Sequence, residues 1–491
     1  MSLGSSANRT NVDQSSPRSA EQLTSLLGRW DDGPGSLHRR LTDAVAELIE
    51  TGVLRSGERL PPERRMAAAL SVARGTVVRS YSSLAEAGLV DRIQGSGTRV
   101  VGDSEPLGSP DATRSNGLFA RHGAAIDLRM AMPSMLRATS DAVDRVRFDG
   151  IDATTLADTE PAGLFALRER IAAHLSRQGL PTTAWQILVT SGAQQAIVLA
   201  IAALVDPGDV VLVEGVTWPG LTDAIAQRGG RAHGVDLDEE GVRPDALEDA
   251  IRRLRPAAIG LNPHHQNPTG SRMSTSRRRE VAELAAGYRV PIIEDRALAH
   301  LAFDGQVATP LAQHAPQHLV VDSINKVAWP GLRIGWLRAD ADLIERLRPV
   351  RAMIDLYSPI HSQLAAIEVL RDWDAIVAER VDGLRRASDL AVDALGASLP
   401  SWRFVRPRGG LVLWAEVPGG GAAAFCDHAA RHGVLIAPGK QFGVEAPFDD
   451  DHVRIPFTVP EPLLIEGIDR LAAAWQSFER TTTAYPVAAV V

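Results

Sequence analysis

The sequence predicts a multidomain protein in which a small α+β domain precedes a larger α/β domain with a smaller α+β lobe. Its 491 residues are enough for two to four domains. Residues 36–101 follow the order helix, helix, turn, helix and glycine hairpin, and from about residue 124 helical segments alternate with short apolar strands. Apolar residues make up 45% of the chain and charged residues 23%, which indicates globular domains with large cores.

Composition excludes several classes of protein. The single cysteine, Cys426, excludes a disulfide framework and a cysteine-built metal cluster. The longest apolar run, residues 196–205, is too short to span a bilayer, and residues 1–18 are Ser-rich and polar, without a signal-peptide core. A net charge of −8 requires any nucleic-acid site to be a local patch. We therefore expect a cytoplasmic protein with no membrane contact.

The first domain has the pattern of a winged helix-turn-helix. A helical face begins at Leu37, Pro61 opens a second helix, and a third helix is expected over residues 74–87. Residues 89–101 alternate like a strand pair, with Gly95-Ser-Gly97 as the tight turn. This order of elements is that of a DNA-binding winged helix-turn-helix.

The remaining boundaries follow from the loss of periodicity. Residues 1–35 are rich in Ser, Gly and Asp and are expected to form a mobile arm. Residues 102–123 are expected to be a linker. The second domain is then expected over 124–480, with a tail at 481–491.

Charge in residues 36–101 supports DNA binding. Ten arginines and seven acidic residues give this segment +3, which leaves −11 on the rest of the chain. Arginine at the start of a recognition helix can bind guanine in bidentate fashion, and residues near the preceding helix and on the wing can contact phosphate or the minor groove. The alternative is a solvated charged face. The expected DNA-binding residues are Arg64, Arg74, Thr76, Thr98 and Arg99.

This segment resembles the GntR-type winged helix over nearly all of residues 37–101. The motifs that carry the resemblance are Gly57-Glu-Arg-Leu-Pro-Pro-Glu-Arg64, Ala73-Arg-Gly-Thr-Val77, Tyr81-Ser-Ser-Leu-Ala-Glu-Ala-Gly-Leu89 and Gln94-Gly-Ser-Gly-Thr98. The family usually has serine at the position of Ala73, so one expected phosphate-contacting hydroxyl is missing.

The second domain is predicted to contain a mostly parallel sheet wrapped by helices. Residues from about 350 to 475 are more mixed and are expected to form the smaller lobe. The expected strands are Ile187–Val189, Val210–Val213, Ala257–Leu261, Ile292–Ile293, Leu319–Val321 and Ile334–Leu337.

Lysine use draws attention to one position in this domain. Only two of the 52 basic residues are lysines, Lys326 and Lys440. Arginine replaces lysine as a surface charge but not as an amine that must lose its proton and attack a carbonyl. Lys326 follows a strand at the edge where α/β sheets bind ligands. We expect Lys326 to be the reactive amine and Lys440 to be ordinary surface, although chance survival is the alternative for either lysine taken alone.

Other segments can supply a pyridoxal phosphate site. Ser323 and Arg333 flank Lys326 with a hydroxyl and a fixed cation suited to phosphate. Ser191-Gly-Ala-Gln-Gln195 opens the helix after the strand that begins at Ile187, so backbone N–H groups can face a phosphate, a weak signal alone.

Three further residues fit the same cofactor, and each has a plainer alternative. Asp295 ends a strand and could keep a pyridine nitrogen protonated, or it could be a helix N-cap. Asn267 in Asn262-Pro-His-His-Gln-Asn-Pro-Thr-Gly270 could donate to the phenolic oxygen, or it could form an Asn-Pro turn. Trp218 could stack on the pyridine ring, or it could be a core tryptophan.

The order of these motifs resembles that of the fold-type I aminotransferases from about residue 125 to 475. The resemblance implies that Lys326 forms the internal aldimine, Asp295 pairs with the ring nitrogen, Asn267 contacts the phenolic oxygen and Trp218 stacks. It implies that Arg454, in Asp451-His-Val-Arg-Ile-Pro-Phe457, binds an α-carboxylate. The implied phosphate-holding residues are Ala193, Gln194, Ser323 and Arg333.

The chain departs from this family at two tyrosines. The family commonly has tyrosine two residues after the aspartate that pairs with the ring, where this chain has Ala297. A tyrosine of the partner subunit usually comes just before the stretch that is Pro161-Ala-Gly-Leu-Phe-Ala-Leu-Arg168 here, where the chain has Ala157 and Asp158. The departures predict slow transamination.

Together the two domains resemble MocR-type transcription regulators. The resemblance implies a homodimer that binds double-stranded operator DNA and pyridoxal 5'-phosphate. Its body would sense the cofactor or an amino compound through aldimine chemistry on Lys326, which changes lobe closure and moves the DNA-binding heads. One alternative is an active aminotransferase with an accessory DNA-binding domain. Another is a body without cofactor that serves only for dimerisation.

Overall fold

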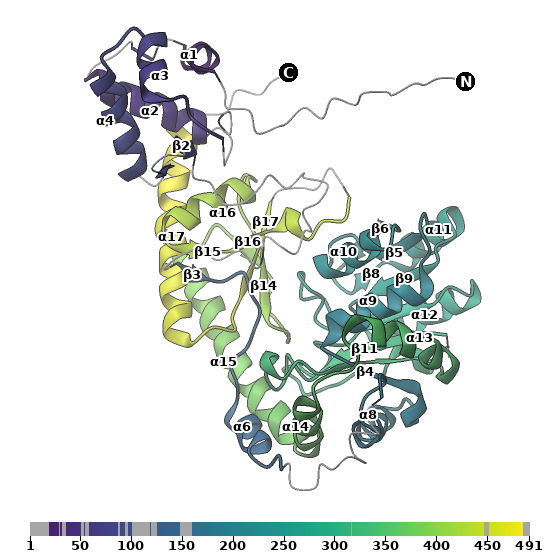
Figure 1. The fold of residues 1–491 in the computed structure, drawn as a ribbon. Coiled ribbons are helices and arrows are strands. Elements are labelled where there is room, and N and C mark those ends of the chain that lie inside the picture. The colour runs from purple at the N-terminus through teal and green to yellow at the C-terminus, as the bar shows by residue number, and fades with distance from the viewer. Residues whose placement is uncertain are drawn as a thin grey trace, which may run out of the picture. The chain divides into compact units, whose positions relative to one another are not determined.

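A computed structural model describes the fold. It describes residues 19–28, 30–31, 36–50, 54, 58–86, 89–93, 97–100, 118, 125–147, 160–315, 317–445 and 451–484. The chain divides into two compact units, Met1–Thr113 and Arg114–Val491 (Figure 1). The expected linker over 102–123 lies outside the described residues except for Leu118, as do the centre of the wing turn and the last seven residues.

The first unit is the expected winged helix-turn-helix. Leu41, Val45 and Met66 are fully buried, and the Tyr81 hydroxyl donates to the Pro61 carbonyl at 3.1 Å, which joins the recognition helix to the segment before the second helix of the motif. The two wing strands pair antiparallel from Val90 opposite Val100. The elements are α1 (Ala20–Leu27), α2 (Leu37–Glu50), α3 (Glu63–Ala69), α4 (Arg74–Glu86), β1 (Val90–Ile93) and β2 (Gly97–Val100).

The expectation of a mobile arm over residues 1–35 is wrong for α1. Ser19 caps this helix through the Gln22 backbone N–H, and the Gln22 side chain accepts from the Ser19 N–H in return. Leu23 is completely buried in the core of the first unit. The rest of the expected arm is described only at 28, 30 and 31. The polar composition of residues 1–35 led to the expectation of a mobile arm, although the segment contains a capped helix with one apolar face.

A seven-stranded sheet forms the larger lobe of the second unit. Its order is β4-β12-β11-β10-β9-β5-β6, and only β12 runs antiparallel to its neighbours. The sequence missed β6, which lies at the edge of the sheet and is therefore more polar than the buried strands. The strands are β4 (Ile187–Thr190), β5 (Val210–Glu214), β6 (Arg231–Val235), β9 (Ala258–Leu261), β10 (Ile292–Asp295), β11 (Leu319–Ser323) and β12 (Gly335–Arg338).

Helices cover both faces of this sheet and bury separate cores. One core packs α9, α10 and α13 against the sheet, and the other packs α11 and α12 against it. The helices of this lobe are α8 (Phe165–Arg177), α9 (Ala193–Leu204), α10 (Pro219–Gln227), α11 (Pro244–Leu254), α12 (Thr275–Gly287) and α13 (Ala341–Asp355). Two short strands, β7 (Leu237–Asp238) and β8 (Gly241–Val242), form a hairpin before α11.

The smaller lobe is built on a four-stranded sheet in the order β13-β14-β17-β16. Its strands are β13 (Arg403–Phe404), β14 (Val412–Glu416), β16 (Ala437–Pro438) and β17 (His452–Pro456), and β3 (Ile126–Asp127) pairs separately with β15 (Val434–Leu435). The surrounding helices are α6 (Arg137–Val143), α14 (Ile360–Arg371), α15 (Trp373–Ser398), α16 (Ala422–Arg431) and α17 (Glu461–Ala484). Helix α17 thus extends four residues into the expected tail.

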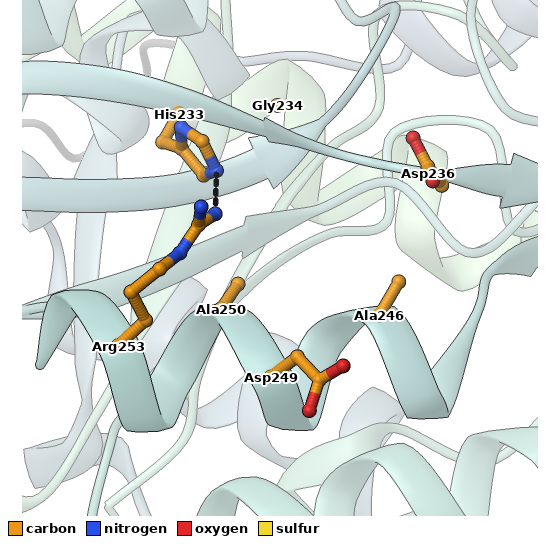
Figure 2. A pocket seen from close by; sticks show the side chains of 7 residues that line it. All are labelled: His233, Gly234, Asp236, Ala246, Asp249, Ala250 and Arg253. Atoms are coloured by element: carbon orange, nitrogen blue, oxygen red, sulfur yellow. Dashed lines mark hydrogen bonds between the residues drawn. The ribbon is translucent and has the colours of Figure 1, made fainter.

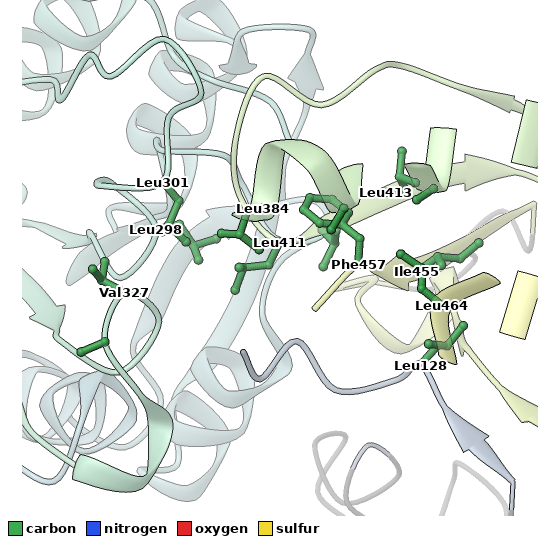
Figure 3. Packing of buried hydrophobic residues seen from close by; sticks show 14 of the residues in the cluster. Leu128, Leu298, Leu301, Val327, Leu384, Leu411, Leu413, Ile455, Phe457 and Leu464 are labelled. Atoms are coloured by element: carbon green, nitrogen blue, oxygen red, sulfur yellow. The ribbon is translucent and has the colours of Figure 1, made fainter. Parts of the chain in front are cut away.

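One apolar cluster joins the two lobes. One of its members, Val327, directly follows the candidate reactive lysine. Others are Leu301 and Leu384, and the cluster also includes Phe457 and Leu413 of the smaller lobe (Figure 3). Burial of such large side chains contributes roughly 1.5–3 kcal/mol each. The lysine segment is therefore packed into the core that connects the lobes.

We predict that Gly335→Ala destabilises the second unit by about 1–3 kcal/mol, since overpacking forces backbone to move. A Cβ atom at position 335 would lie 2.6 Å from the Gly192 carbonyl carbon and 2.8 Å from both the Ala193 nitrogen and the Asp322 oxygen. Denaturant unfolding of the full chain measures the loss. The matched control is Gly396→Ala in α15, where a Cβ has nothing within 4 Å. Equal stability of the two variants would contradict the prediction.

Candidate active site

Lys326 lies just after β11 and points its amine at the second unit's N-terminal segment. Its Nζ donates to the Ala131 carbonyl at 2.8 Å. Burial lowers the pKa of Lys326 to about 8, the nearby cations of Arg454 and Arg333 lower it as well, and Asp295 acts in the opposite direction. Roughly a tenth of the amine is then neutral at pH 7, far more than for an ordinary lysine. Lys440, in contrast, is exposed.

Asp295 ends β10 beside the strand that leads to Lys326. Burial raises the pKa of Asp295 to about 6, against the effects of a hydrogen bond from the Ala297 N–H and of Lys326. The bond to Ala297 closes a turn, and no helix begins at this point of the described chain, so Asp295 is not the helix N-cap that was its plainer interpretation. At neutral pH the carboxyl is mainly ionised. Its charge can therefore hold a proton on a nearby ring nitrogen.

Asp295 and Trp218 line the same cavity. The other lining residues are Ile197, Thr217, Leu221, Leu261, Asn262 and Ile293, which make the walls largely apolar. The Trp218 indole N–H donates to Gln194 Oε1 at 2.8 Å, and the Gln194 amide donates to the Gly220 carbonyl at 2.7 Å. Gln194 thus uses its side chain to orient the tryptophan.

The turn between β4 and α9 forms a narrow cradle. Gly192 has φ +99°, and a Cβ there would lie 2.7 Å from Asn325 Nδ2 and 3.4 Å from Arg333 Nη2. Arg333 Nη2 also donates to the Ser191 carbonyl. Ser323 is buried at the end of β11, and Ala193 begins α9. Backbone N–H groups at a helix start and a fixed guanidinium are the groups that bind phosphate.

Arg454 and Asn267 meet across the two lobes. Arg454, on β17 of the smaller lobe, donates from Nη1 to Asn267 Oδ1 at 3.0 Å and from Nη2 to the Arg129 carbonyl. Because Oδ1 of Asn267 is engaged, its amide N–H₂ group points elsewhere. Arg454 is 1% exposed, burial lowers its pKa to about 9, and its Nε has no partner among the described residues.

Behind Asp295 lies a buried ionic network that the sequence analysis did not anticipate. Glu294 Oε1 accepts from Arg278 at 2.8 Å and from Arg296 at 3.3 Å, and it lies 3.0 Å from His264 Nε2. The two guanidinium groups hold the pKa of Glu294 well below its usual range although burial alone would raise it. Arg296 therefore turns into the core, and Ala297 occupies the position where the aminotransferases commonly have a tyrosine. The sequence Glu294-Asp295-Arg296, in which two charged residues flank Asp295 at the end of a buried strand, was the pattern that could have indicated this network.

The structure brings the predicted cofactor residues together. Asp295 and Trp218 line an apolar cavity, the charge of Asp295 acts on the Lys326 amine, and Asn325 and Arg333 border the space that a Cβ on Gly192 would occupy, next to Ala193. Ser323 is buried at the end of β11, and no described contact joins it to this turn. This donor set fits pyridoxal phosphate, which needs an amine, a carboxylate near the ring nitrogen and phosphate donors. Positions 157 and 158 lie outside the described residues.

A second, polar pocket lies between β6 and α11 and contains none of the predicted site residues. Figure 2 shows His233, Asp236, Asp249 and Arg253 around it. Arg253 Nη2 and His233 Nε2 are 3.3 Å apart, and His233 Nδ1 pairs with Glu445. This pocket thus borders the point where the segment after β16 is anchored to the sheet edge.

The predicted DNA-binding residues lie in the first unit, and all of them except Thr98 are at least partly exposed to solvent. Arg64 and Arg74 are exposed, and Arg74 forms an ion pair with Glu63 at 3.1 Å. Thr76 lies in the first turn of α4, and Arg99 is partly exposed on β2. Thr98 is buried, at 9% exposure, so its side chain faces the core of this unit and not solvent.

Comparisons with known proteins agree with both units. The model of aminotransferase class I and II matches residues 134–471, and the model of bacterial regulatory proteins of the gntR family matches residues 37–100. The chain is 28% identical over 470 residues to YisV, an uncharacterized HTH-type transcriptional regulator of Bacillus subtilis, covering 88% of this chain and 95% of the relative. It is 28% identical to the HTH-type transcriptional regulator TauR of Rhodobacter capsulatus, covering 90% and 97%.

A solved structure has the same fold as the second unit. LysN, an alpha-aminoadipate aminotransferase from Thermus thermophilus, was crystallised with N-(5'-phosphopyridoxyl)-L-leucine. It superposes with a TM-score of 0.69 at 25% identity, covering 76% of this chain and 96% of LysN. The fold-type I architecture expected from the sequence is therefore confirmed.

We predict that covalent capture of pyridoxal phosphate speeds up with pH and levels off above about 8. Only the neutral amine attacks a carbonyl, and the pKa of Lys326 is lowered to about 8. Stopped-flow absorbance from pH 6 to 10 measures the rate. Arg454→Gln removes a cation and should move the midpoint to higher pH, while Asp295→Asn should move it to lower pH. Lys440→Ala is the control, and a wild-type midpoint near 10.5, the value of an ordinary lysine, would refute the assignment.

Proposed function

We propose that the chain is a DNA-binding transcription regulator of the MocR type that uses pyridoxal phosphate. It belongs to the class I and II aminotransferase family through residues 134–471, and it carries a GntR-type DNA-binding domain at residues 37–100. Its body senses the cofactor, or an amino compound, at Lys326. The observation that carries the proposal is the convergence of the partly buried Lys326 amine, Asp295 and Arg454 in a chain with a DNA-binding head.

The length of the similarity favours a regulator over a free enzyme. The relatives named HTH-type transcriptional regulators match 88–90% of this chain in the two cases above, whereas the 2-aminoadipate transaminase of Thermus thermophilus matches 59% at 30% identity. Of these relatives, the regulators share the arrangement of both domains. A protein that acts on chromosomal DNA works in the cytoplasm, which is part of the proposal.

Each residue has a distinct role in this proposal. Pyridoxal phosphate supplies an aldehyde that attaches to an amine and a ring that withdraws electrons. Lys326 provides the amine and accepts or returns a proton at Nζ, while Asp295 keeps the proton on the ring nitrogen. Trp218 would stack on the ring, and Asn267 would donate from its amide to the phenolic oxygen. Ala193, Gln194, Ser323 and Arg333 hold the phosphate, with Gln194 contributing its backbone.

In this proposal, the response to a ligand begins when its carboxylate competes with the present hydrogen-bond partners of Arg454. Its guanidinium already binds Asn267 and the Arg129 carbonyl, so a carboxylate that approaches it must replace at least one of these contacts. Since Arg454 belongs to the smaller lobe and Asn267 to the larger one, the exchange alters how the lobes are held together. A ligand that binds one lobe arrangement more tightly than another shifts the equilibrium between them. That shift is passed to the DNA-binding unit.

The proposal includes a homodimer. Met353, Ile354, Leu356 and Tyr357 form an exposed apolar patch at the end of α13, and Met353 is 81% exposed. Asp355, within the patch, accepts hydrogen bonds from Ser191 and Gln195, so the patch borders the phosphate cradle. Large exposed patches of this kind mark interfaces. A monomeric mass in sedimentation at micromolar concentration would contradict this part.

No helix in the described part of the chain is suited to crossing a membrane.

An active aminotransferase is the second candidate, favoured by the same set of Lys326, Asp295 and Arg454. Ala297 argues against it because no hydroxyl at that position can donate to the phenolic oxygen. Rapid complete turnover with a common pair of amino and keto acids would favour this candidate.

We predict that Lys326→Ala abolishes the response of operator binding to pyridoxal phosphate. The wild-type protein should turn yellow with the cofactor, carry it on Lys326 after borohydride reduction, and change its affinity for operator DNA by about 5-fold or more. The operator is obtained by selecting random DNA with the full chain, and affinity is measured by fluorescence anisotropy. Lys440→Ala should behave like the wild type. A cofactor label on Lys440, or an unchanged response of Lys326→Ala, would sink the proposal.

We predict that Arg74→Ala weakens specific operator binding by about 1–3 kcal/mol, the usual contribution of a bidentate contact to a base. The body of this variant should still bind the cofactor. Wild-type affinity should also fall steeply with salt, because phosphate contacts release counterions. Arg137→Ala is the matched control, since Arg137 is exposed on α6 of the second unit. Equal binding by both variants would show that α4 does not read the bases.

A further inference from the structure

The backbone of Arg129–Ala131 spans the distance between the reactive amine and the carboxylate-binding arginine. The carbonyl of Arg129 accepts from Arg454, and the carbonyl of Ala131 accepts from Lys326 at 2.8 Å. Met130 lies between these two carbonyls. An amino acid with its carboxylate on Arg454 and its amino group toward Lys326 would therefore lie along this segment.

The side chains beside this segment form an apolar cluster. Phe442 is 1% exposed, and the Arg454 guanidinium carbon lies 4.5 Å from the centre of its ring. The described members of the cluster are Leu118, Met130, Val216, Trp218, Trp414, Ala437 and Phe442. Trp414 also faces Arg454 directly across the strand pair β14–β17. The surroundings of Arg454 are thus aromatic and aliphatic.

The cluster is held in place by backbone bonds between the lobes. The Phe442 carbonyl accepts from the Thr217 N–H at 2.9 Å, and the Val444 N–H donates to the Gly215 carbonyl at 3.0 Å. Glu445 then pairs with His233 on the edge strand β6. The apolar wall is therefore part of the structure before any ligand arrives.

The nearby cations and imidazoles are engaged or neutral. Arg129 forms a bidentate pair with Asp127 at 3.0 and 2.8 Å. His452 stacks on Trp414 and bonds to Asp451. Burial lowers the pKa of His265, two residues from Asn267, to about 4. A second carboxylate beside this wall would consequently have to break an existing pair or remain without a counter-ion.

From these observations we propose that the effector is a monocarboxylic amino acid with a large apolar or aromatic side chain. This inference rests on the proposed function and specifies the ligand of the same site. The α-carboxylate binds Arg454, and the side chain packs against the partly exposed Met130 and Trp414, which rest on the buried ring of Phe442. Acidic side chains are rejected because burying an unpaired carboxylate against apolar residues is costly.

The test is isothermal titration of the wild-type protein loaded with pyridoxal phosphate. L-leucine, L-methionine and L-phenylalanine should bind at least tenfold more tightly than L-glutamate, L-aspartate and L-lysine. 3-Methylbutylamine, which has the side chain of leucine but no carboxylate, should bind at least tenfold more weakly than leucine. Equal or tighter binding of glutamate, or no binding of any compound, would overturn the inference.

Variants separate the contribution of the apolar wall from that of the cofactor site. Phe442→Ala should weaken leucine binding about tenfold or more while alanine binding changes much less. Lys440→Ala, on the same short helical turn but exposed, should leave both unchanged. If Phe442→Ala no longer binds the cofactor, Met130→Ala serves the same comparison. A yellow protein whose operator binding responds to the cofactor but which prefers acidic amino acids would refute the inference and leave the proposed function standing.

Discussion

The site depends on partly shielding the Lys326 amine from water in surroundings that carry more positive than negative charge. Protonating that amine is less favourable than protonating an exposed lysine, because burial disfavours its charged form and because Arg454 and Arg333 repel the added charge. Asp295 limits the effect, and the three charges come from different parts of the sequence. The parallel pairing of β10 with β11 brings Asp295 to the end of the sheet where Lys326 lies. The antiparallel pair β14–β17 delivers Arg454 from the other lobe.

Much of this arrangement could be predicted from the sequence because it depends on local patterns. Buried strands are short apolar runs, so the strand ends that carry Lys326 and Asp295 were located correctly, as was the winged helix. Strand β6 was missed because an edge strand need not be apolar, and α1 because its cap and single apolar face lie in a Ser-rich segment. The side chain of Gln194, which orients Trp218, and the burial of Thr98 depend on packing that no local pattern encodes. The bond between Arg454 and Asn267 joins residues 187 positions apart.

The ionic network around Glu294 gives the loop after β10 a rigid foundation. Arg296 reaches the network from one side of Asp295, and its Nη2 donates onward to Gln178 at 2.8 Å. Removing one partner of such a buried network leaves an uncompensated charge, which lowers the free energy of unfolding by about 3–5 kcal/mol. Asp295 is therefore held between a charged core behind it and the apolar cavity in front. Rigidity of this kind would suit the role proposed for Asp295, in which the carboxylate has to face a single ring atom.

In the proposed function, the contacts of Arg454 would also set the ligand concentration at which the protein responds. With its guanidinium already bonded to Asn267 and to a backbone carbonyl, the ligand-free arrangement is stable by itself, and an incoming carboxylate gains only the difference between two sets of hydrogen bonds. Giving up one or two such bonds, at about 0.5–1.5 kcal/mol each, weakens affinity by roughly 2- to 150-fold relative to an arginine that waits unbonded. In the proposed function, such an arrangement would make the protein insensitive to traces of its ligand.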